Sequence, residues 1–375
     1  MKNSTKKRVV ISVTNDLSTD QRVKKVCESL TKLNMDILLV GRLLPDSKNL
    51  ERPYACKRMK LIFNRGALFY AEYNLRLFLL LLFSNVDVYH ANDLDTLLAN
   101  YLASKIRRKP LVYDSHEYFT GVPEIQNRKL VKNTWTKIER WIFPKLNHIF
   151  TVNDAIASRY HQQYGKEIRV LRNIPRKKQA YNFKSKHELN IPEGKNIIIT
   201  QGAGINIDRG IEEAVQAMQY LSNVYFIIIG NGDVIPQLKE RVLQLELENS
   251  VIFKNKMPYE EMMQYTYHAE LGLTLDKNTN TNYKLSLPNK LFDYIHAGIP
   301  ILASKVVEVE KIVKKYNIGL LIENHEPKHI AQQIQIALND NLKAKYESNL
   351  KKAAQELSWE HEENKLIELY NKIAG

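Results

Sequence analysis

Short apolar runs rich in β-branched residues alternate with amphipathic segments along almost the whole chain. The first such unit is VVISV at 9–13, a predicted helix that begins near residue 19, and ILLV at 37–40. Ser18 and Gln21 have the spacing of a capping box at the start of this helix. Strands that alternate with helices are typical of parallel, doubly wound sheets. The pattern therefore predicts an α/β protein.

The alternation is interrupted once, between residues 172 and 195, by a basic and polar stretch that contains two prolines. It restarts at NIIITQG (196–202) and continues to IGLLI (318–322). We therefore expect two Rossmann-like domains, at 1–172 and 173–357, with a cleft between the carboxyl ends of their sheets. A last helix is predicted at about 358–375.

The most apolar run, LFLLLLF at 77–83, is far shorter than the roughly 20 residues of a membrane-spanning helix. The pattern predicts one buried helix here. The amino terminus is basic, but its apolar run has only the length of a strand, which argues against a signal peptide.

The net charge and the cysteine content bear on the binding partners and on the cellular compartment of the protein. The chain has 375 residues and a net charge of +14. Such a charge suits nucleic acid, an anionic membrane surface or phosphorylated substrates. The basic residues are scattered without an aromatic-interleaved patch, so we expect no nucleic acid partner. A solvated basic surface and a peripheral membrane contact both remain open. Two cysteines, Cys27 and Cys56, provide no disulfide framework, which favours a cytoplasmic protein.

A glycine-containing turn follows the first strand of the second domain. Gly202 and Gly204 end the run NIIITQGAG, and Arg209 stands just before the next predicted helix. Glycines let backbone amides approach an anion, and a guanidinium can hold phosphate oxygens. The alternative is a strand-to-helix turn that needs glycine only for its geometry. A second turn of this kind, GNGD, follows at 230–233.

The segment KLSLPNKLFDYIHAGIP, at 284–300, predicts another helix, with Ser286 as a candidate cap and Gly298 at its end. Lys290 and Asp293 lie three residues apart on one face near its start. They form either an internal ion pair worth a few tenths of a kcal/mol or a site with separate ligands, a phosphate on Lys290 and a ribose on Asp293. Together with Arg209, Lys290 indicates a nucleoside diphosphate site.

Polar residues also follow the strands of the first domain. The motifs YHANDLD (89–95) and YDSHEYF (113–119) predict that His90 and His116 lie at the carboxyl edge of the sheet. Asp93 either caps the following helix, at 94–104, or joins Asp95 at a metal; we expect the cap and no metal. Asn15 and Asp16, in the loop expected after the first strand, are candidates for substrate contact. Glu117, beside His116, is a third.

These motifs give the chain a resemblance to the family 4 glycosyltransferases, which are retaining enzymes of the GT-B fold. LPNKLFDYIHAGIPILAS resembles the signature block of the family, and IIITQGAGINIDRGIEEAVQAM and VYFIIIGNGD resemble the two elements that precede it. SWE at 358–360 resembles the segment that returns the chain to the first domain, so the last helix is expected to pack there. The resemblance covers essentially the whole chain.

The resemblance implies roles for individual residues. Arg209 and Lys290 would hold the donor diphosphate with the amides of Gly204 and Asn289, and Asp293 would bind the ribose. His116 would face the donor sugar, which makes His116, Arg209 and Lys290 the candidate catalytic residues. The base would lie near Lys254–Lys256, mostly on backbone groups. Gly202 completes the donor set, and Asn15, Asp16 and Glu117 form the acceptor side.

Two departures from the family pattern affect specificity. The family often has a glutamate eight positions before the acidic residue of the signature helix, and Leu285 occupies that position here. The glycine-rich loop after the first strand is replaced by TNDLSTDQ.

We therefore expect a metal-independent, retaining glycosyltransferase without a cofactor. Its co-substrate would be a UDP- or GDP-linked sugar, and its acceptor a glycan or lipid-linked glycan at the inner face of the membrane. Two alternatives remain, a sugar-nucleotide 2-epimerase and a non-catalytic nucleotide-sugar or glycan-binding protein.

Overall fold

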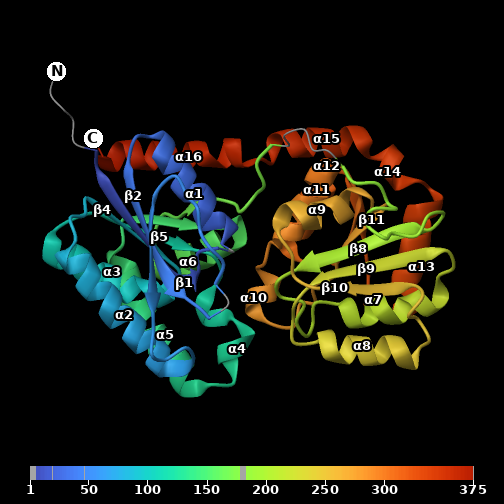
Figure 1. Ribbon diagram of the computed structural model, residues 1–375, viewed down its shortest axis with the longest axis horizontal. Coiled ribbons are helices and arrows are strands. Elements are labelled where there is room, and N and C mark those ends of the chain that lie inside the picture. The colour runs from blue at the N-terminus through green and yellow to red at the C-terminus, as the bar shows by residue number, and fades with distance from the viewer. Residues whose placement is uncertain (1–5, 19, 46, 178–182, 375) are drawn as a thin grey trace. The chain divides into compact units, whose positions relative to one another are not determined.

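The computed structural model describes residues 6–18, 20–45, 47–177 and 183–374, so the part of the interdomain stretch at 178–182 and the amino terminus at 1–5 lie outside the described residues. The chain forms two compact units, residues 1–173 with 361–375 and residues 174–360. The boundaries expected from the sequence are 172 and 357. Each unit contains one parallel sheet (Figure 1).

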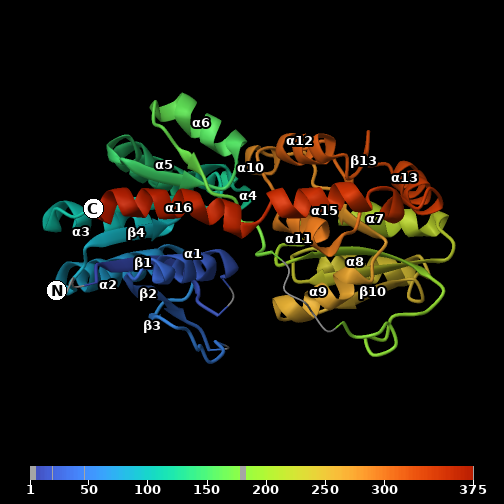
Figure 2. The ribbon, with the colours of Figure 1, turned by 90° about the horizontal axis from the view of Figure 1, so that it is seen from above.

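Unit 1 is built on a seven-stranded sheet with the order β3-β2-β1-β4-β5-β6-β7. Its strands are β1 (Arg8–Asp16), β2 (Asp36–Leu43), β3 (Ala55–Lys60), β4 (Val88–Asn92), β5 (Leu111–Ser115), β6 (His148–Thr151) and β7 (Arg169–Val170). Its helices are α1 (Gln21–Lys32), α2 (Gly66–Phe83), α3 (Leu94–Arg107), α4 (Pro123–Gln126), α5 (Lys129–Ile142) and α6 (Asp154–Tyr164). Helices α2, α3 and α5 cover one face of the sheet, and α1 and α16 (Trp359–Ala374) the other (Figures 1 and 2).

Unit 2 repeats this topology in a six-stranded sheet with the order β10-β9-β8-β11-β12-β13. Its strands are β8 (Asn196–Gly202), β9 (Val224–Gly230), β10 (Val251–Lys254), β11 (Leu271–Thr274), β12 (Ile301–Ala303) and β13 (Gly319–Leu321). Its helices are α7 (Ile211–Ala217), α8 (Ile235–Gln244), α9 (Tyr259–Tyr267), α10 (Thr281–Lys284), α11 (Asn289–Ala297), α12 (Val307–Tyr316), α13 (Pro327–Asn339), α14 (Leu342–Lys345) and α15 (Glu347–Glu356).

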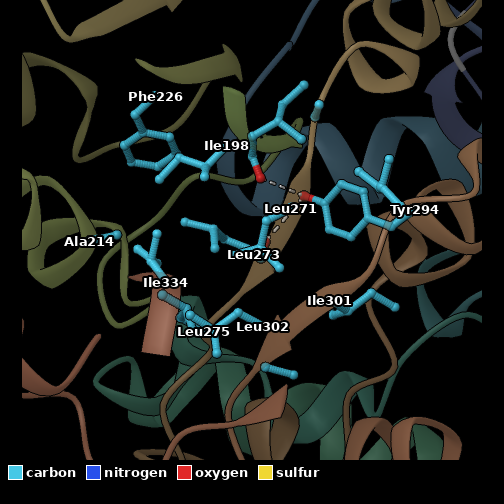
Figure 3. Close-up of a cluster of buried hydrophobic side chains, with 14 of the residues drawn as sticks. Ile198, Ala214, Phe226, Leu271, Leu273, Leu275, Tyr294, Ile301, Leu302 and Ile334 are labelled. Carbon is cyan, nitrogen blue, oxygen red and sulfur yellow. Dashed lines mark hydrogen bonds between the residues drawn. The ribbon is translucent and has the colours of Figure 1, made fainter. Parts of the chain in front are cut away.

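The core of unit 2 explains why its strands read as continuous apolar runs. Both faces of the sheet are covered by helices, so consecutive side chains of β8 and β9 are buried. Tyr294 of α11 brings a polar hydroxyl into this cluster (Figure 3). Its hydroxyl lies 3.1 Å from the carbonyl of Leu273 and 3.4 Å from that of Ile199, to both of which it donates. The bonds join α11 to β8 and β11.

Two expectations about helix caps are wrong. The cap of α1 is Asp20, whose Oδ1 accepts from the amide of Val23 at 3.0 Å, and not Ser18. Pro288 occupies the cap position of α11, while the hydroxyl of Ser286 donates to the carbonyl of Tyr283. In both cases the helix begins later than the sequence pattern indicated. Asp20 and Pro288 therefore lie directly before the first turn, and the predicted serines lie two residues further away.

The chain is helical at 77–83, as expected, but the expectation that this helix is buried is wrong for half of its surface. Helix α2 is 18 residues long, and its buried side chains are Phe69, Tyr73, Leu77 and Leu81. Four other apolar side chains on the helix, those of Leu68, Leu75, Leu79 and Phe83, are exposed. Among the described residues α2 is the one helix long and apolar enough to cross a membrane by length and composition.

Candidate functional site

The polar residues of unit 2 gather where the strand order reverses. Strands β8 and β11 are neighbours in the sheet, but the chain leaves them in opposite directions, to β9 and to β12. Such a switch point leaves an opening at the carboxyl ends of the strands. The loop at 203–210 follows β8, and Asp276 follows β11. The amide of Lys277 donates to the carbonyl of Asp208 at 2.9 Å, which joins the two loops.

Arg209 is held on two sides at this switch point. Its Nη1 donates to Oδ2 of Asp276 at 2.7 Å, and its guanidinium lies 4.0 Å from the ring centroid of Tyr283. Burial lowers the pKa of Arg209, but the carboxylate of Asp276 and the hydroxyl of Tyr283 outweigh this and raise it. The side chain is therefore a permanent, oriented cation.

Lys290 belongs to the same electrostatic cluster. It lies in the first turn of α11, and its Nζ donates to Oγ1 of Thr200 at 3.4 Å. Burial lowers its pKa, Asp276 raises it and Arg209 lowers it, so the net shift is downward. An ammonium has three donors, and the described residues engage one of them here, at a long distance. A bound anion would compensate the charge of the ammonium and so offset the free-energy cost of burying it.

Three buried polar atoms, on Arg209 and at the end of β11 and just beyond it, have no hydrogen-bond partner in the described part of the chain. They are Nε of Arg209, Oδ1 of Asp276 and Oγ1 of Thr274. Thr274 and Asp276 are both almost fully buried. Buried polar groups are normally satisfied, and those at ligand sites are frequent exceptions. The switch point thus carries unused hydrogen-bonding capacity of both kinds, donor and acceptor.

Asp293 is fixed by two hydrogen bonds one turn further along α11. Its Oδ2 accepts from Nε2 of Gln201 at 3.0 Å and its Oδ1 from the hydroxyl of Tyr259 at 3.0 Å. Gln201 is fixed in turn, since its Oε1 accepts from the hydroxyl of Thr266 at 2.6 Å. Each carboxylate oxygen has a second lone pair. Asp293 is therefore an oriented hydrogen-bond acceptor.

The glycines of the 202–204 turn have different roles. Gly202 has φ of 152°, which a side chain rarely adopts. Gly204 is exposed, and a Cβ there would have one neighbour within 4 Å, Nδ2 of Asn206 at 3.9 Å. Packing within the chain does not require glycine at 204, so the space beside its backbone is open to a ligand. Asn289, the first residue of α11, is also exposed.

In unit 1, His116 follows β5 and is surrounded by acidic side chains. Its backbone amide donates to Oδ1 of Asp93 at 2.7 Å, and its Nδ1 lies 3.4 Å from Oδ2 of Asp93. Its Nε2 lies 3.0 Å from Oδ1 of Asn92 and 3.6 Å from Oδ2 of Asp114. Burial lowers the pKa of His116, but the two carboxylates outweigh it and raise the pKa to about 9. His116 is therefore an imidazolium at neutral pH.

Asp93 does not act as the helix cap expected from the sequence. It occupies the cap position of α3, but its side chain accepts no capping bond and binds His116 instead. Its backbone has φ of 57°, which is sparsely populated by residues other than glycine. Asp95, one residue into α3, is buried; burial and Asp93 raise its pKa to about 7. Within the described residues, no three His, Cys, Asp or Glu side chains form a metal-binding group.

Asp114 joins His116 to a buried arginine that was not among the residues predicted from the sequence. Arg22 of α1 donates through Nε and Nη2 to the two oxygens of Asp114, at 3.0 and 2.6 Å. Both side chains are nearly inaccessible to solvent. Burial raises the pKa of Asp114, but Arg22 and His116 outweigh it and lower the pKa strongly. A basic residue in the first turn of the first helix is the signal that would have drawn attention to Arg22.

The expectation for His90 is wrong. It lies within β4 rather than at its end and is fully buried. Its Nδ1 lies 2.7 Å from the hydroxyl of Tyr370 in α16. The imidazole is therefore part of the packing between the sheet and α16, and burial lowers its pKa to about 4.

Asn15 and Asp16 are the last residues of β1 and do not lie in a loop, because β1 continues to Asp16 after a register shift beyond Ser12. Asp16 accepts from the amide of Ser18 at 2.9 Å, and Nδ2 of Asn15 donates to Asp20 at 3.2 Å. The carbonyl of Glu117 accepts from the hydroxyl of Ser115. All three residues follow or end strands of unit 1, near the carboxyl edge of its sheet.

Asp276, the residue that orients Arg209, was not among the candidates predicted from the sequence. It directly follows the apolar run LGLTL, so its position after a strand is the same signal that marked Asp93 and His116. The sequence contains no comparable signal for three further residues, because their role depends on contacts with α11. These residues are Thr200, Gln201 and Tyr259.

Two family models match the chain, one in each unit. The model described as Glycosyltransferase Family 4 matches residues 20–174, and the model described as Glycosyl transferases group 1 matches residues 182–357. The comparison with curated proteins found no match.

Several solved structures are similar over the whole chain. Sucrose-phosphate synthase from Thermosynechococcus elongatus has a TM-score of 0.79 at 16% identity, covering 98% of this chain and 99% of its own. Anabaena Alr3699/HepE in complex with UDP-glucose has a TM-score of 0.74 at 16% identity, covering 97% and 99%. WaaG, a glycosyltransferase involved in lipopolysaccharide biosynthesis, has a TM-score of 0.68 at 15% identity, covering 96% and 98%. The fold is therefore that of the GT-B glycosyltransferases.

Proposed function

Because the chain belongs to the family 4 glycosyltransferases, we propose that it transfers a sugar from a UDP- or GDP-linked donor to a glycan or lipid-linked glycan in the cytoplasm, with retention and without a metal. The observation that carries the donor assignment is the pair of cations, Arg209 and Lys290, at the switch point of the sheet of unit 2. The Anabaena neighbour crystallised with UDP-glucose supports a nucleotide sugar.

The diphosphate is proposed to bind between Arg209, Lys290 and the amides of Gly204 and Asn289. Arg209 remains oriented by Asp276 when the ligand arrives, so little rearrangement is needed. The ionised side chains of Arg209, Lys290 and Asp276 carry a net charge of +1, which favours the binding of an anion. The unpartnered Nε of Arg209 provides a further donor.

The ribose hydroxyls are proposed to donate to Asp293. Gln201 and Tyr259 each donate to one oxygen of this carboxylate, so the carboxylate has a fixed orientation. Lys290 and Asp293 lie three residues apart, within one helical turn, which separates the phosphate contact from the ribose contact.

In the proposed reaction the bond between the anomeric carbon and the β-phosphate oxygen breaks, and its electron pair remains on that oxygen. The two cations stabilise this charge in the transition state. The acceptor hydroxyl forms the new bond on the same face of the sugar and transfers its proton to the departing phosphate. His116, as an imidazolium, is proposed to act on the donor sugar, and Asn15, Asp16 and Glu117 on the acceptor.

Replacing Lys290 tests the donor site. We expect UDP- or GDP-sugars to raise the melting temperature of the wild type, and Lys290→Ala to weaken the affinity by roughly 10–100-fold, because a charge-assisted contact is worth about 1.5–3 kcal/mol. Lys239→Ala, at an exposed lysine of α8, is the matched control and should bind the donor like the wild type. Absence of stabilisation by every nucleotide sugar would exclude the proposed donor class.

Product analysis separates transfer from the alternatives. Incubation of the stabilising donor with glycan acceptors should release the nucleoside diphosphate and form a new α- or β-glycosidic bond of the donor's own configuration, seen in the anomeric proton coupling. A coupling constant that shows the opposite anomeric configuration in the product would contradict retention. An epimerised donor would indicate a 2-epimerase, and binding without turnover a non-catalytic protein.

A further inference from the structure

Helix α2 has two apolar faces, and one of them is buried in unit 1. Phe69, Tyr73, Leu77 and Leu81 recur at intervals of four residues and are buried in unit 1. On the opposite side, Leu68, Leu75, Leu79 and Phe83 recur at intervals of four and seven. Leu75 is 61% exposed and Phe83 is 81% exposed. A helix of 18 residues is about 27 Å long, so these side chains form an extended stripe.

The segment before α2 adds to this stripe. The amides of Ile62 and Phe63 donate to the carboxylate of Glu72, at 3.0 and 2.9 Å, and both side chains are exposed. Glu72 therefore holds this segment against the helix. We call the exposed side chains of Ile62, Phe63, Leu68, Leu75, Leu79 and Phe83 the α2 outer face.

Basic residues accompany the α2 outer face. Between residues 55 and 83 the chain has five basic side chains and one acidic side chain, namely Lys57, Arg58, Lys60, Arg65 and Arg76 against Glu72. Nη2 of Arg76 lies 2.6 Å from Glu72, so the single negative charge is compensated within the helix. Nη1 of Arg76 donates to the carbonyl of Lys60, which connects the helix to the end of β3. Lys57, Lys60 and Arg65 are exposed.

From this combination we infer that the α2 outer face binds the surface of an anionic lipid bilayer. An exposed apolar stripe with basic neighbours is the pattern of helices that lie in the membrane interface, with the apolar side chains among the acyl chains and the basic side chains at the head groups. A second copy of the chain fits less well, since a twofold contact would bring the same basic residues together.

The helix lies on the membrane and does not cross it. The hydroxyl of Tyr73 donates to the carbonyl of Val13 at 2.6 Å, and Nδ2 of Asn74 donates to the carbonyl of Asp95 at 2.8 Å. These bonds and the buried side chains attach α2 to β1 and α3. Crossing would require α2 to leave the core of unit 1.

Vesicle flotation of the full-length protein tests this inference. We expect the wild type to float with vesicles that contain phosphatidylglycerol, and not with vesicles of phosphatidylcholine alone. The triple variant Leu68→Gln, Leu75→Gln, Leu79→Gln should lower the partition coefficient at least about tenfold, because three apolar side chains no longer enter the acyl region. The double variant Lys57→Gln, Lys60→Gln should lower it roughly 25-fold at low salt, at about 1 kcal/mol for each charge.

Matched variants in unit 2 control for surface composition. Leu243 of α8 is 61% exposed, like Leu75, so Leu243→Gln should leave the partition unchanged. Lys239→Gln with Lys328→Gln removes two exposed lysines elsewhere and should likewise have little effect. All variants should retain the melting temperature of the wild type, because each changed side chain is exposed.

A fluorescent label locates the contact directly. An environment-sensitive dye at Leu79→Cys, in a Cys56→Ser background that leaves buried Cys27 as the other thiol, should shift to the blue on anionic vesicles. The same dye at Leu243→Cys should not. Failure of the wild type to float, or flotation unaffected by the triple variant, would overturn the inference. Concentration-dependent dimerisation lost in the triple variant, without flotation, would assign the face to a second copy. None of these readouts depends on the proposed donor or reaction.

Discussion

At the scale of the residue, the charge of His116 is determined by its neighbours. The imidazole has Asp93 on one side and Asp114 on the other, and Arg22 holds Asp114 in its ionised form. Unusual backbone geometry at Asp93 accompanies this arrangement. Strain at a polar residue beside a titratable group is frequent at functional sites.

The pKa of His116 provides a direct test of this arrangement. In an NMR titration we expect the wild-type imidazole to remain charged at pH 7 and to titrate near pH 9. Asp93→Asn removes one negative charge but tolerates the same positive φ, so it should lower the pKa of His116 by roughly 1–2 pH units. A wild-type imidazole that titrates near 6.5 would contradict the proposed charge.

The same shift predicts how stability depends on pH. Because the pKa of His116 is higher in the folded state than in the unfolded state, its contribution is complete below about pH 6.5 and is lost as pH rises through about 9. The difference in unfolding free energy between the wild type and His116→Gln should therefore decrease over this range. A difference independent of pH would indicate a purely steric role.

At the scale of the element, the apolar periodicity identified the strands and helices but not their ends or exposure. Four-residue spacing in α2 is compatible with burial on either side, so the sequence did not reveal which stripe faces the core. The start of α1 was misplaced for a similar reason. Ser18 and Asp20 are both good capping residues, and the choice depends on where β1 ends.

The cap of α1 can be tested by comparing two substitutions. Asp20→Ala should lower the unfolding free energy by about 1 kcal/mol, because the amide of Val23 loses its acceptor. Ser18→Ala should have an effect within about 0.5 kcal/mol. Urea denaturation followed by circular dichroism measures both. A larger effect of Ser18→Ala than of Asp20→Ala would support the capping box predicted from the sequence.

At the scale of the whole molecule, unit 1 is completed by residues from the end of the chain. Residues 361–375 belong to unit 1, although unit 2 intervenes in the sequence. Oε2 of Glu363 accepts from the hydroxyl of Ser29 at 2.6 Å, and the hydroxyl of Tyr370 binds His90. Leu366 and Tyr370 are fully buried. The stability of unit 1 therefore depends on α16.

This dependence predicts a local effect of a distant substitution. Tyr370→Ala should destabilise unit 1 by about 3–5 kcal/mol, the usual cost of a large aromatic deletion in a core. In hydrogen exchange, peptides from β1, β4 and α1 should lose protection, while those from β8 and β9 keep it. Tyr370→Phe retains the ring and should cost about 1 kcal/mol. Equal loss of protection in both units would show that α16 does not act on unit 1 alone.

The sequence by itself determined the α/β class, the division into two units and the segments that carry Arg209, Lys290, Asp293 and His116. These features depend on periodicity and on residues that follow strands, and both are local. The tertiary structure decided what is paired with what: Asp276 with Arg209, Asp93 and Asp114 with His116, and Tyr370 with His90. It also decided that one face of α2 is exposed. Contacts between distant segments depend on strand order and on which helix covers which face, and hydrophobic spacing along the chain contains neither.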